Sequence, residues 1–215
     1  MPTNFPTSVD NFTNPTANDS LNLPSHSTQH ANANDAIEAV EDYLLNGNGR
    51  AGFAHLNTTS FSASSGVNIN NVFSATYQAY KIVLSNMSCG SSSQNIFMRL
   101  RVSGVNAASN YFESGYVSYI PGSVLAFAGN SAVAEVILST VNATHRAGSV
   151  TELQNPALAV ATTMQNQRNY YDGSNLYGVG LSMIHTTATA YDGFTIYPGA
   201  STMTGTVSVF GYRNS

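Results

Sequence analysis

The chain has 215 residues and a net charge of −4 at pH 7, and only 8% of its residues are charged, against about 25% in an average globular protein. It contains no clustered basic stretch, so a nucleic-acid partner is not expected. It also lacks an apolar run of about 18 residues and a basic, apolar leader, so we expect neither membrane insertion nor a secretion signal. The single cysteine, Cys89, excludes an intrachain disulfide and a cysteine-based metal cluster within one chain.

Residues 1–33 predict an extended arm. Pro6, Pro15 and Pro24 each fix their own φ and push the preceding residue toward extended geometry. Most other positions up to Gln29 hold Asn, Asp, Ser or Thr, whose side chains bond to nearby backbone and favour turns. A disordered tail would have the same composition. In the alternative that we favour, the few large apolar side chains are anchors that become buried on a partner: Phe5, Val9, Phe12, Leu21 and Leu23.

The charges are divided unevenly between this arm and the rest of the chain. Residues 1–49 contain six acids and no Lys or Arg, whereas residues 50–215 contain seven cations and five acids, a net of +2. We therefore expect the arm to dock on a neutral or basic surface.

One helix is predicted within residues 34–46. Asn34 can cap its start, and Asp35 and Glu38 lie in the first turn, where the helix dipole favours acids. The Asn-Gly-Asn-Gly run after Leu45 ends it.

The apolar residues of this helix predict a coiled-coil seam. The 4-3-4 spacing of a and d positions is formed by Ala33, Ile37, Val40 and Leu44. With Ile at an a position and Val at a d position, three strands are more natural than two, so we expect a homotrimer. A helix that packs against its own β domain is the alternative. So short a helix is marginal in water by itself and needs one of these two partners.

Residues 50–215 predict a mainly β domain, an antiparallel, jelly-roll-like sandwich. Alternation is clearest from Met98 to Val102, where the apolar residues point one way and Arg99 and Arg101 the other. Gly-rich and Pro-Gly turns separate ten expected strands. These strands are His55–Phe61, Val67–Phe73, Gln78–Leu84, Ile96–Ser103, Tyr116–Ile120, Val133–Ser139, Ala157–Met164, Tyr177–Ile184, Gly193–Tyr197 and Thr204–Tyr212.

The amino-acid sequence of the arm and helix contains three runs that resemble a segment found in other proteins. It contains F-P-T-S-x-D-x-F-T-N-P-T from Phe5, L-x-x-P-S-H-S-x-Q-H from Leu21 and N-D-A-I-E-A-x-E from Asn34. Together these runs resemble an N-terminal segment of tail, fibre and related virion proteins of tailed bacteriophages. The later stretches YKIVLSNMS and TGTVSVFGYRN are similar to the β-rich modules attached to such segments.

The resemblance implies a virion-attachment arm that leads into a trimerising helix and a variable distal module. The implied partners are other virion proteins, either a tail adaptor or baseplate or the capsid, on a particle assembled in the host cytoplasm. The residues expected to anchor the arm are Phe5, Pro6, Phe12, Pro15, Leu21 and Leu23.

No pattern in the sequence predicts an enzyme or a cofactor. The acids of the β domain are far apart along the chain, and no nucleophile elbow, zinc-protease helix or phosphate-binding loop is present. A glycan-cleaving tailspike would need two of these carboxylates paired in a cleft.

His26 and His30 are four residues apart, and on a threefold axis such histidines could gather around a metal. Their segment follows a proline and has no clear helical pattern, so helical i,i+4 spacing cannot be assumed. We therefore predict no metal site, and expect two polar histidines that bond within the arm or to its docking surface.

The best candidate for recognition is the polar, aromatic stretch 166–172, read as a loop. Tyrosine offers a flat apolar face with a hydroxyl, and Arg, Asn and Asp add directional hydrogen bonds, a mixture suited to a host surface glycan. The expected contact residues are Arg168, Asn169, Tyr170, Tyr171 and Asp172. Tyrosines that line strands or subunit interfaces are the alternative.

The sequence therefore predicts a virion structural protein, with a trimeric short tail fibre or receptor-binding fibre as the leading function. A head fibre or a capsid cement protein is the alternative, because it would use the same arm and helix. A glycan-hydrolysing tailspike is the third class.

Overall fold

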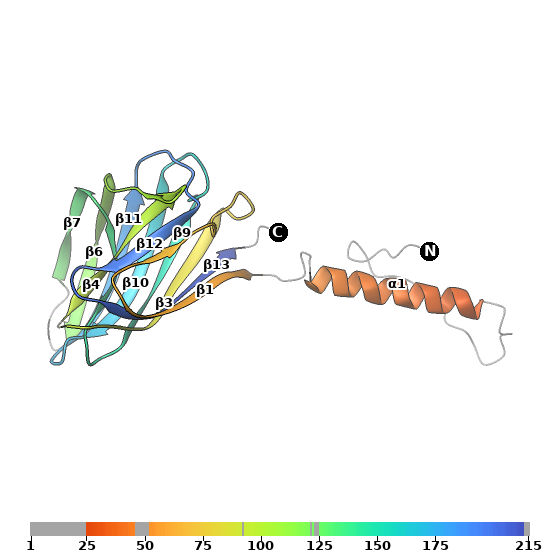
Figure 1. Cartoon of the computed structure of the whole chain (residues 1–215), viewed down its shortest axis with the longest axis horizontal. Helices are drawn as coiled ribbons and strands as arrows, with labels where there is room; N and C mark the ends of the chain where they lie inside the picture. Colours follow the sequence, from red (N-terminus) through yellow and green to blue (C-terminus); the bar gives the residue numbers. More distant parts are fainter. Residues whose placement is uncertain (1–24, 46–51, 92, 121, 123–124, 213–215) are drawn as a thin grey trace. The chain divides into compact units, whose positions relative to one another are not determined.

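The computed structural model describes residues 25–45, 52–91, 93–120, 122 and 125–212. The chain divides into two compact units, of which the first contains the helix α1 and the second begins at Phe53. The predicted arm up to Pro24 and its six anchoring residues lie outside the described part. The expected fold class, an antiparallel β-sandwich preceded by one short helix, is confirmed (Figure 1).

The helix α1 spans His26–Leu45, so the predicted start at Asn34 is wrong. Ser25 occupies the position before the helix, and its carbonyl accepts the first helical bond from the Gln29 N–H at 3.0 Å. Serine is a preferred N-cap residue, and Pro24 before it cannot itself lie in the helix interior. Residues 26–33 are therefore helical and belong to α1, not to an extended arm.

The core of the β unit is a jelly roll. Its first four strands pair antiparallel and in reverse order with its last four, as β1·β13, β2·β12, β3·β9 and β4·β8, which is the connectivity of that fold. The eight strands are β1 (Phe53–Ser64), β2 (Val67–Ile69), β3 (Ala79–Cys89), β4 (Gln94–Val102), β8 (Val136–Val141), β9 (Ala147–Gln154), β12 (Gly193–Pro198) and β13 (Met203–Tyr212).

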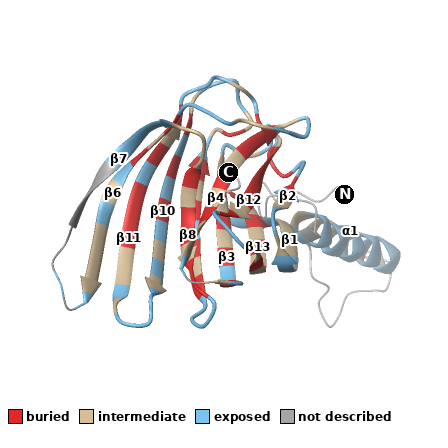
Figure 2. Cartoon of the chain, turned by 60° about the vertical axis from the view of Figure 1, so that its left-hand side comes forward, coloured by how far each residue is buried: buried red, intermediate tan, exposed pale blue. Residues whose placement is uncertain are grey.

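Two insertions add five strands to this frame. One lies between β4 and β8 and contains β5 (Val105–Asn106), β6 (Tyr111–Ile120) and β7 (Leu125–Val133); the other lies between β9 and β12 and contains β10 (Thr162–Tyr171) and β11 (Leu176–His185). The order β10-β11-β6-β7 continues the larger sheet beyond β9. We call these four strands the extension. Figure 2 shows β11, β6 and β7 to one side of β8, the strand of the smaller sheet nearest to them.

The two sheets enclose one apolar core. The predicted alternation in β4 is confirmed, since Met98 and Leu100 are fully buried while Arg99 and Arg101 point to the other side. Large side chains from both sheets fill the interior; those fully buried include Tyr80, Ile82, Leu84, Met87, Ile96, Tyr111, Leu138, Leu153, Phe194 and Ile196.

Most of the ten predicted strands are present, but several regions differ. The strands β5, β7 and β9 were missed, β6 begins at Tyr111 rather than at Tyr116, and β10 begins at Thr162 rather than at Ala157. The apolar run from Ala157 to Val160 looked like a strand, yet it follows a proline and forms a turn in which Leu158 is 39% and Val160 45% exposed. The stretch 166–172 is consequently strand and turn, not a loop.

Arg101 is the centre of a polar network on the outer side of the smaller sheet. Only 8% of the residue is exposed, and its guanidinium donates five hydrogen bonds of 2.6–3.1 Å. The acceptors are the side chains of Asn68, Asn70, Asn106 and Thr195 and the carbonyl of Gly104. The network joins β2, β4, β5 and β12, and the Thr195 hydroxyl adds bonds of 2.8 Å to Asn68 and Asn106.

We expect Arg101→Ala to lower the free energy of unfolding by roughly 2–4 kcal/mol, since the variant loses five hydrogen bonds of one buried guanidinium, including the bond to the buried Thr195 hydroxyl. Arg146→Ala is the matched control, because Arg146 is exposed and donates one bond of 2.8 Å to the Asn86 carbonyl. Urea unfolding followed by circular dichroism measures both. Equal stability of the two variants would contradict the structural role of Arg101.

Candidate recognition site on the inserted strands

The candidate site lies where the strands β10 and β11 meet. Strand register places Phe53 opposite Tyr212 at one end of the larger sheet, and the turn between Tyr171 and Leu176 at the other. We call the end that carries this turn the distal end, because the chain enters the sandwich at Phe53. The predicted contact stretch 166–172 runs toward it.

The five predicted contact residues do not share one face. Side chains of β10 alternate, so Asn169 and Tyr171 face outward whereas Arg168 and Tyr170 face the inner side of the sheet. Asp172 follows in the turn. Three of the five therefore remain as surface groups, and Arg168 and Tyr170 have other roles.

Arg168 attaches the extension to the smaller sheet. Its guanidinium donates to the Ile137 carbonyl of β8 at 3.0 Å, and the Glu113 carboxylate of β6 accepts from the N–H of the same residue at 3.4 Å. Burial lowers the pKa of Arg168 to about 10, although the charge of Glu113 opposes this shift. The arginine thus stays charged at neutral pH and supplies a donor to one backbone carbonyl of β8, that of Ile137.

Tyr170 belongs to a stack of three rings on neighbouring strands. Its ring lies 4.6 Å from that of Tyr177 with an interplanar angle of 7°, and Tyr177 lies 5.7 Å from Tyr119 at 29°. Cross-strand register places the three residues side by side on β10, β11 and β6. All three are half-buried. We call this set the tyrosine stack; sequence reasoning identified Tyr170 but missed Tyr177 and Tyr119, which only strand pairing brings to it.

The next row toward the tip is apolar and exposed. Tyr171, Leu176 and Ile120 are 39%, 48% and 67% exposed, and register places them side by side on the same three strands. We call them the exposed row. An exposed apolar cluster with polar groups around it is one of the features that mark binding surfaces.

The turn supplies a charged group at the tip. One oxygen of Asp172 accepts the N–H groups of Ser174 and Asn175, each at 2.8 Å. These two backbone bonds lower the pKa of Asp172, so its carboxylate is charged at neutral pH. A hydrogen bond to Asp172 is the main cause that raises the pKa of Tyr177, which keeps that phenol neutral.

The loop between β8 and β9 lies beside this turn. Asn142 donates its amide to the Tyr171 carbonyl at 2.7 Å, and the ring of His145 meets that of Tyr171 edge-on at 4.8 Å. His145 and Arg146 are exposed. The distal end thus combines aromatic faces with imidazole, guanidinium, amide and carboxylate groups.

A shallow cavity of about 230 Å³ lies at this end of the sheet. It is lined by Ser118, Tyr119, Ile120, Asn169, Leu176, Tyr177 and Gly178. Aromatic and aliphatic walls with a few amides and hydroxyls suit a ligand that has both C–H faces and hydroxyl groups, as a sugar ring does.

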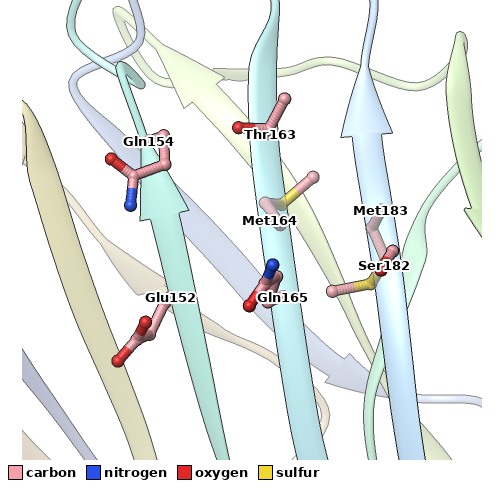
Figure 3. Close-up of a pocket in the computed structure, with 7 residues that line it drawn as sticks. All are labelled: Glu152, Gln154, Thr163, Met164, Gln165, Ser182 and Met183. Atoms are coloured by element: carbon pink, nitrogen blue, oxygen red, sulfur yellow. The ribbon is translucent and has the colours of Figure 1, made fainter.

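A second shallow cavity of about 290 Å³ lies on the larger sheet, nearer to the Phe53 end (Figure 3). Figure 3 shows the amides of Gln154 and Gln165 and the carboxylate of Glu152 along β9 and β10. Glu152 accepts a hydrogen bond of 2.5 Å from the Tyr212 hydroxyl and lies 3.7 Å from the Lys81 ammonium. Its carboxylate therefore already has structural partners. The alternation of polar residues along β10 could have indicated this face from the sequence.

The acids of the β unit each have such partners. Glu113 accepts from Asn130 at 2.6 Å, Glu135 from Arg99 at 2.6 Å, and Asp192 from the Ser103 N–H at 2.8 Å. Within the described ranges, no three His, Cys, Asp or Glu side chains gather where they could hold a metal ion. That the protein is not an enzyme and needs no cofactor stays a prediction.

The predicted seam residues lie on one stripe of α1. Ile37, Val40 and Leu44 are 56%, 41% and 52% exposed within the single chain, and Ala33 is exposed too. Residues spaced by three and four lie on the same face of a helix, so these side chains form one exposed apolar stripe.

Comparisons with known proteins add little to this geometry. No protein-family model matches the chain, and no curated protein matches it. Among solved structures, a protein of unknown function from Shewanella oneidensis MR-1 is similar at 10% identity over 77% of this chain and 90% of that one, with a TM-score of 0.14. So low a score supports no conclusion about fold or function. Among the described helical residues, none form a helix long and apolar enough to cross a membrane.

We expect Arg168→Ala to destabilise the sandwich by roughly 1–3 kcal/mol, because the Ile137 carbonyl and Glu113 both lose the charge that faces them. Gln167→Ala, on the outer face of the same strand, should change stability by less than about 0.5 kcal/mol. Thermal unfolding of the two variants measures the difference. Unchanged stability of the Arg168 variant would contradict this structural role.

Proposed function

We propose that the protein is a bacteriophage virion structural protein, a trimeric short tail fibre or receptor-binding fibre. Its N-terminal arm attaches it to the particle, and its jelly roll carries the surface that contacts the host. The resemblance of the arm to virion-attachment segments supports the first part. The exposed seam of α1 is the single observation that carries the trimer.

Burial of the exposed seam residues would stabilise a trimer. Ile37, Val40 and Leu44 are each about half exposed on the helix, and covering that exposed half contributes roughly 0.7–1.5 kcal/mol per side chain, about half of the value for full burial. A bundle of three copies buries all of them with the a and d spacing that such bundles use. Ordering the helix opposes this gain, so the trimer depends on every layer of a short seam.

The distal end supports contact with a host surface. It lies at the end of the larger sheet opposite Phe53, where the sandwich connects to the arm and helix. A glycan stacked on Tyr171, with hydrogen bonds to Asn169 and His145, would make a weak single site. Three such sites on one trimer raise the effective concentration and hence the avidity.

A capsid cement protein or head fibre is the second candidate. It would use the same arm and trimer, and the exposed row would then be a contact between virion proteins. A fibre is present in tens of copies or fewer, whereas a cement protein matches the capsid lattice. The copy number of this chain per particle therefore separates the two.

We expect Ile37→Asp to weaken trimerisation by several kcal/mol, because a charge placed in the seam has no partner there. The sandwich should keep its melting temperature, since it forms a separate compact unit. Ala31→Asp is the control, as residue 31 is exposed and outside the seam. Light scattering at micromolar concentration measures the mass. A wild-type monomer would refute the trimer.

We expect purified protein to compete with phage particles for adsorption to host cells, and Tyr171→Ala combined with Leu176→Ala to reduce that competition about tenfold or more. Leu158→Ala is the matched control, because Leu158 has the same 39% exposure as Tyr171 but lies in the turn before β10. Unchanged competition by the double variant would remove the distal end as the receptor site. Normal adsorption together with fragile heads in a deletion mutant would favour the cement protein.

A further inference from the structure

The early start of α1 places two histidines inside the helix. His26 and His30 were expected outside the helix, and they lie in its first two turns. Continuing the seam toward the N-terminus gives residues 26, 30, 33, 37, 40 and 44, with spacings of 4, 3, 4, 3 and 4. Both histidines therefore occupy a and d positions of the same stripe as Ile37, Val40 and Leu44.

The two imidazoles already face each other within one chain. Their Nε2 atoms are 3.1 Å apart, the ring centroids are 4.4 Å apart, and the rings are almost perpendicular at 86°. Two nitrogens bound to one ion at about 2.0–2.1 Å, with an angle between about 90° and 109°, lie roughly 2.8–3.4 Å apart. The pair thus has the separation of two ligands on one transition-metal ion.

One chain supplies only half of a coordination sphere. The described residues contain no group of three or more metal-binding side chains, so His26 and His30 alone would hold an ion weakly. In a threefold bundle all helices run in the same direction, and the same two positions of three chains meet around the axis. The ion would then be surrounded by up to six imidazole nitrogens.

We propose that the N-terminal end of the helix bundle is a histidine site for a divalent transition-metal ion such as Zn²⁺ or Ni²⁺, completed only when three copies assemble. This inference rests on the trimer of the proposed function. Imidazole ligands suit zinc, nickel and copper rather than magnesium or calcium. Ligation needs both Nε2 lone pairs, so the imidazole that donates to the other in the free chain transfers that proton to its Nδ1.

The charge pattern of the helix fits this assignment. Between Ser25 and Asn34 there is no Lys or Arg to repel a cation. The helix dipole disfavours positive charge near an N-terminus, so the lone pairs and not the local field must hold the ion. The apolar seam is short, and an ion that links three chains would stabilise the bundle at the end where the seam has no large aliphatic residue.

The test uses the full-length protein, freed of metal with EDTA and titrated with Ni²⁺ or Zn²⁺. Native mass spectrometry should find one ion per three chains, and sedimentation should show that the ion favours the trimer. His26→Ala and His30→Ala should each weaken metal binding about tenfold or more. His55→Ala is the control, because His55 lies in β1 and bonds to Thr58 at 2.8 Å.

The outcomes separate this site from the trimer itself. A protein that is trimeric in EDTA but binds neither ion overturns the metal site alone. Binding of one ion per chain, equally tight in the Ile37→Asp variant, also overturns it, because the copies would then contribute nothing. A chain that is monomeric with and without metal overturns both the site and the trimer. A monomer that assembles when Ni²⁺ or Zn²⁺ is added supports both.

Discussion

The pairing of the first four jelly-roll strands with the last four, in reverse order, is the constraint on which the rest of the β unit depends. It places the start of β1 and the end of β13 opposite each other, so the sandwich begins and ends at one edge of the larger sheet. Connections elsewhere are free to grow, because they interrupt no pair of this frame. Both insertions use that freedom, and they pair with each other through β6 and β11.

A chain with few charges must stabilise these insertions by other means. Asn166 is 1% exposed, and its amide donates to the Leu138 carbonyl at 2.9 Å and to the Thr151 hydroxyl at 2.8 Å. Together with Arg168 and Glu113 it bonds the backbone of β8 to the extension. Two of the scarce cations, Arg101 and Arg168, thus bond to groups of the fold itself.

The sequence predicted correctly those elements whose pattern lies within a few neighbouring residues. The alternation in β4 and the seam spacing after Ala33 predicted correct elements, because neighbouring residues carry the whole pattern. The start of α1 was missed since Asn34 and Asp35 form an equally good helix start. The tyrosine stack could not be predicted, because Tyr119, Tyr170 and Tyr177 are joined only by strand order.

The predicted contact residues could not be assigned to one face from the sequence either. The geometry of strands and helices explains why, and it suggests how the two units could share a function. A strand turns successive side chains to opposite faces, so a continuous stretch such as 168–171 was bound to divide between structure and surface. A helix instead gathers every third or fourth residue on one stripe. The stripe that begins at His26 therefore draws the groups of the proposed assembly surface from 19 positions of α1, and the distal end draws those of the proposed recognition site from three strands. If the stripe binds three copies, each weak distal site is repeated three times at a fixed stoichiometry, and avidity follows from the helix rather than from the sandwich.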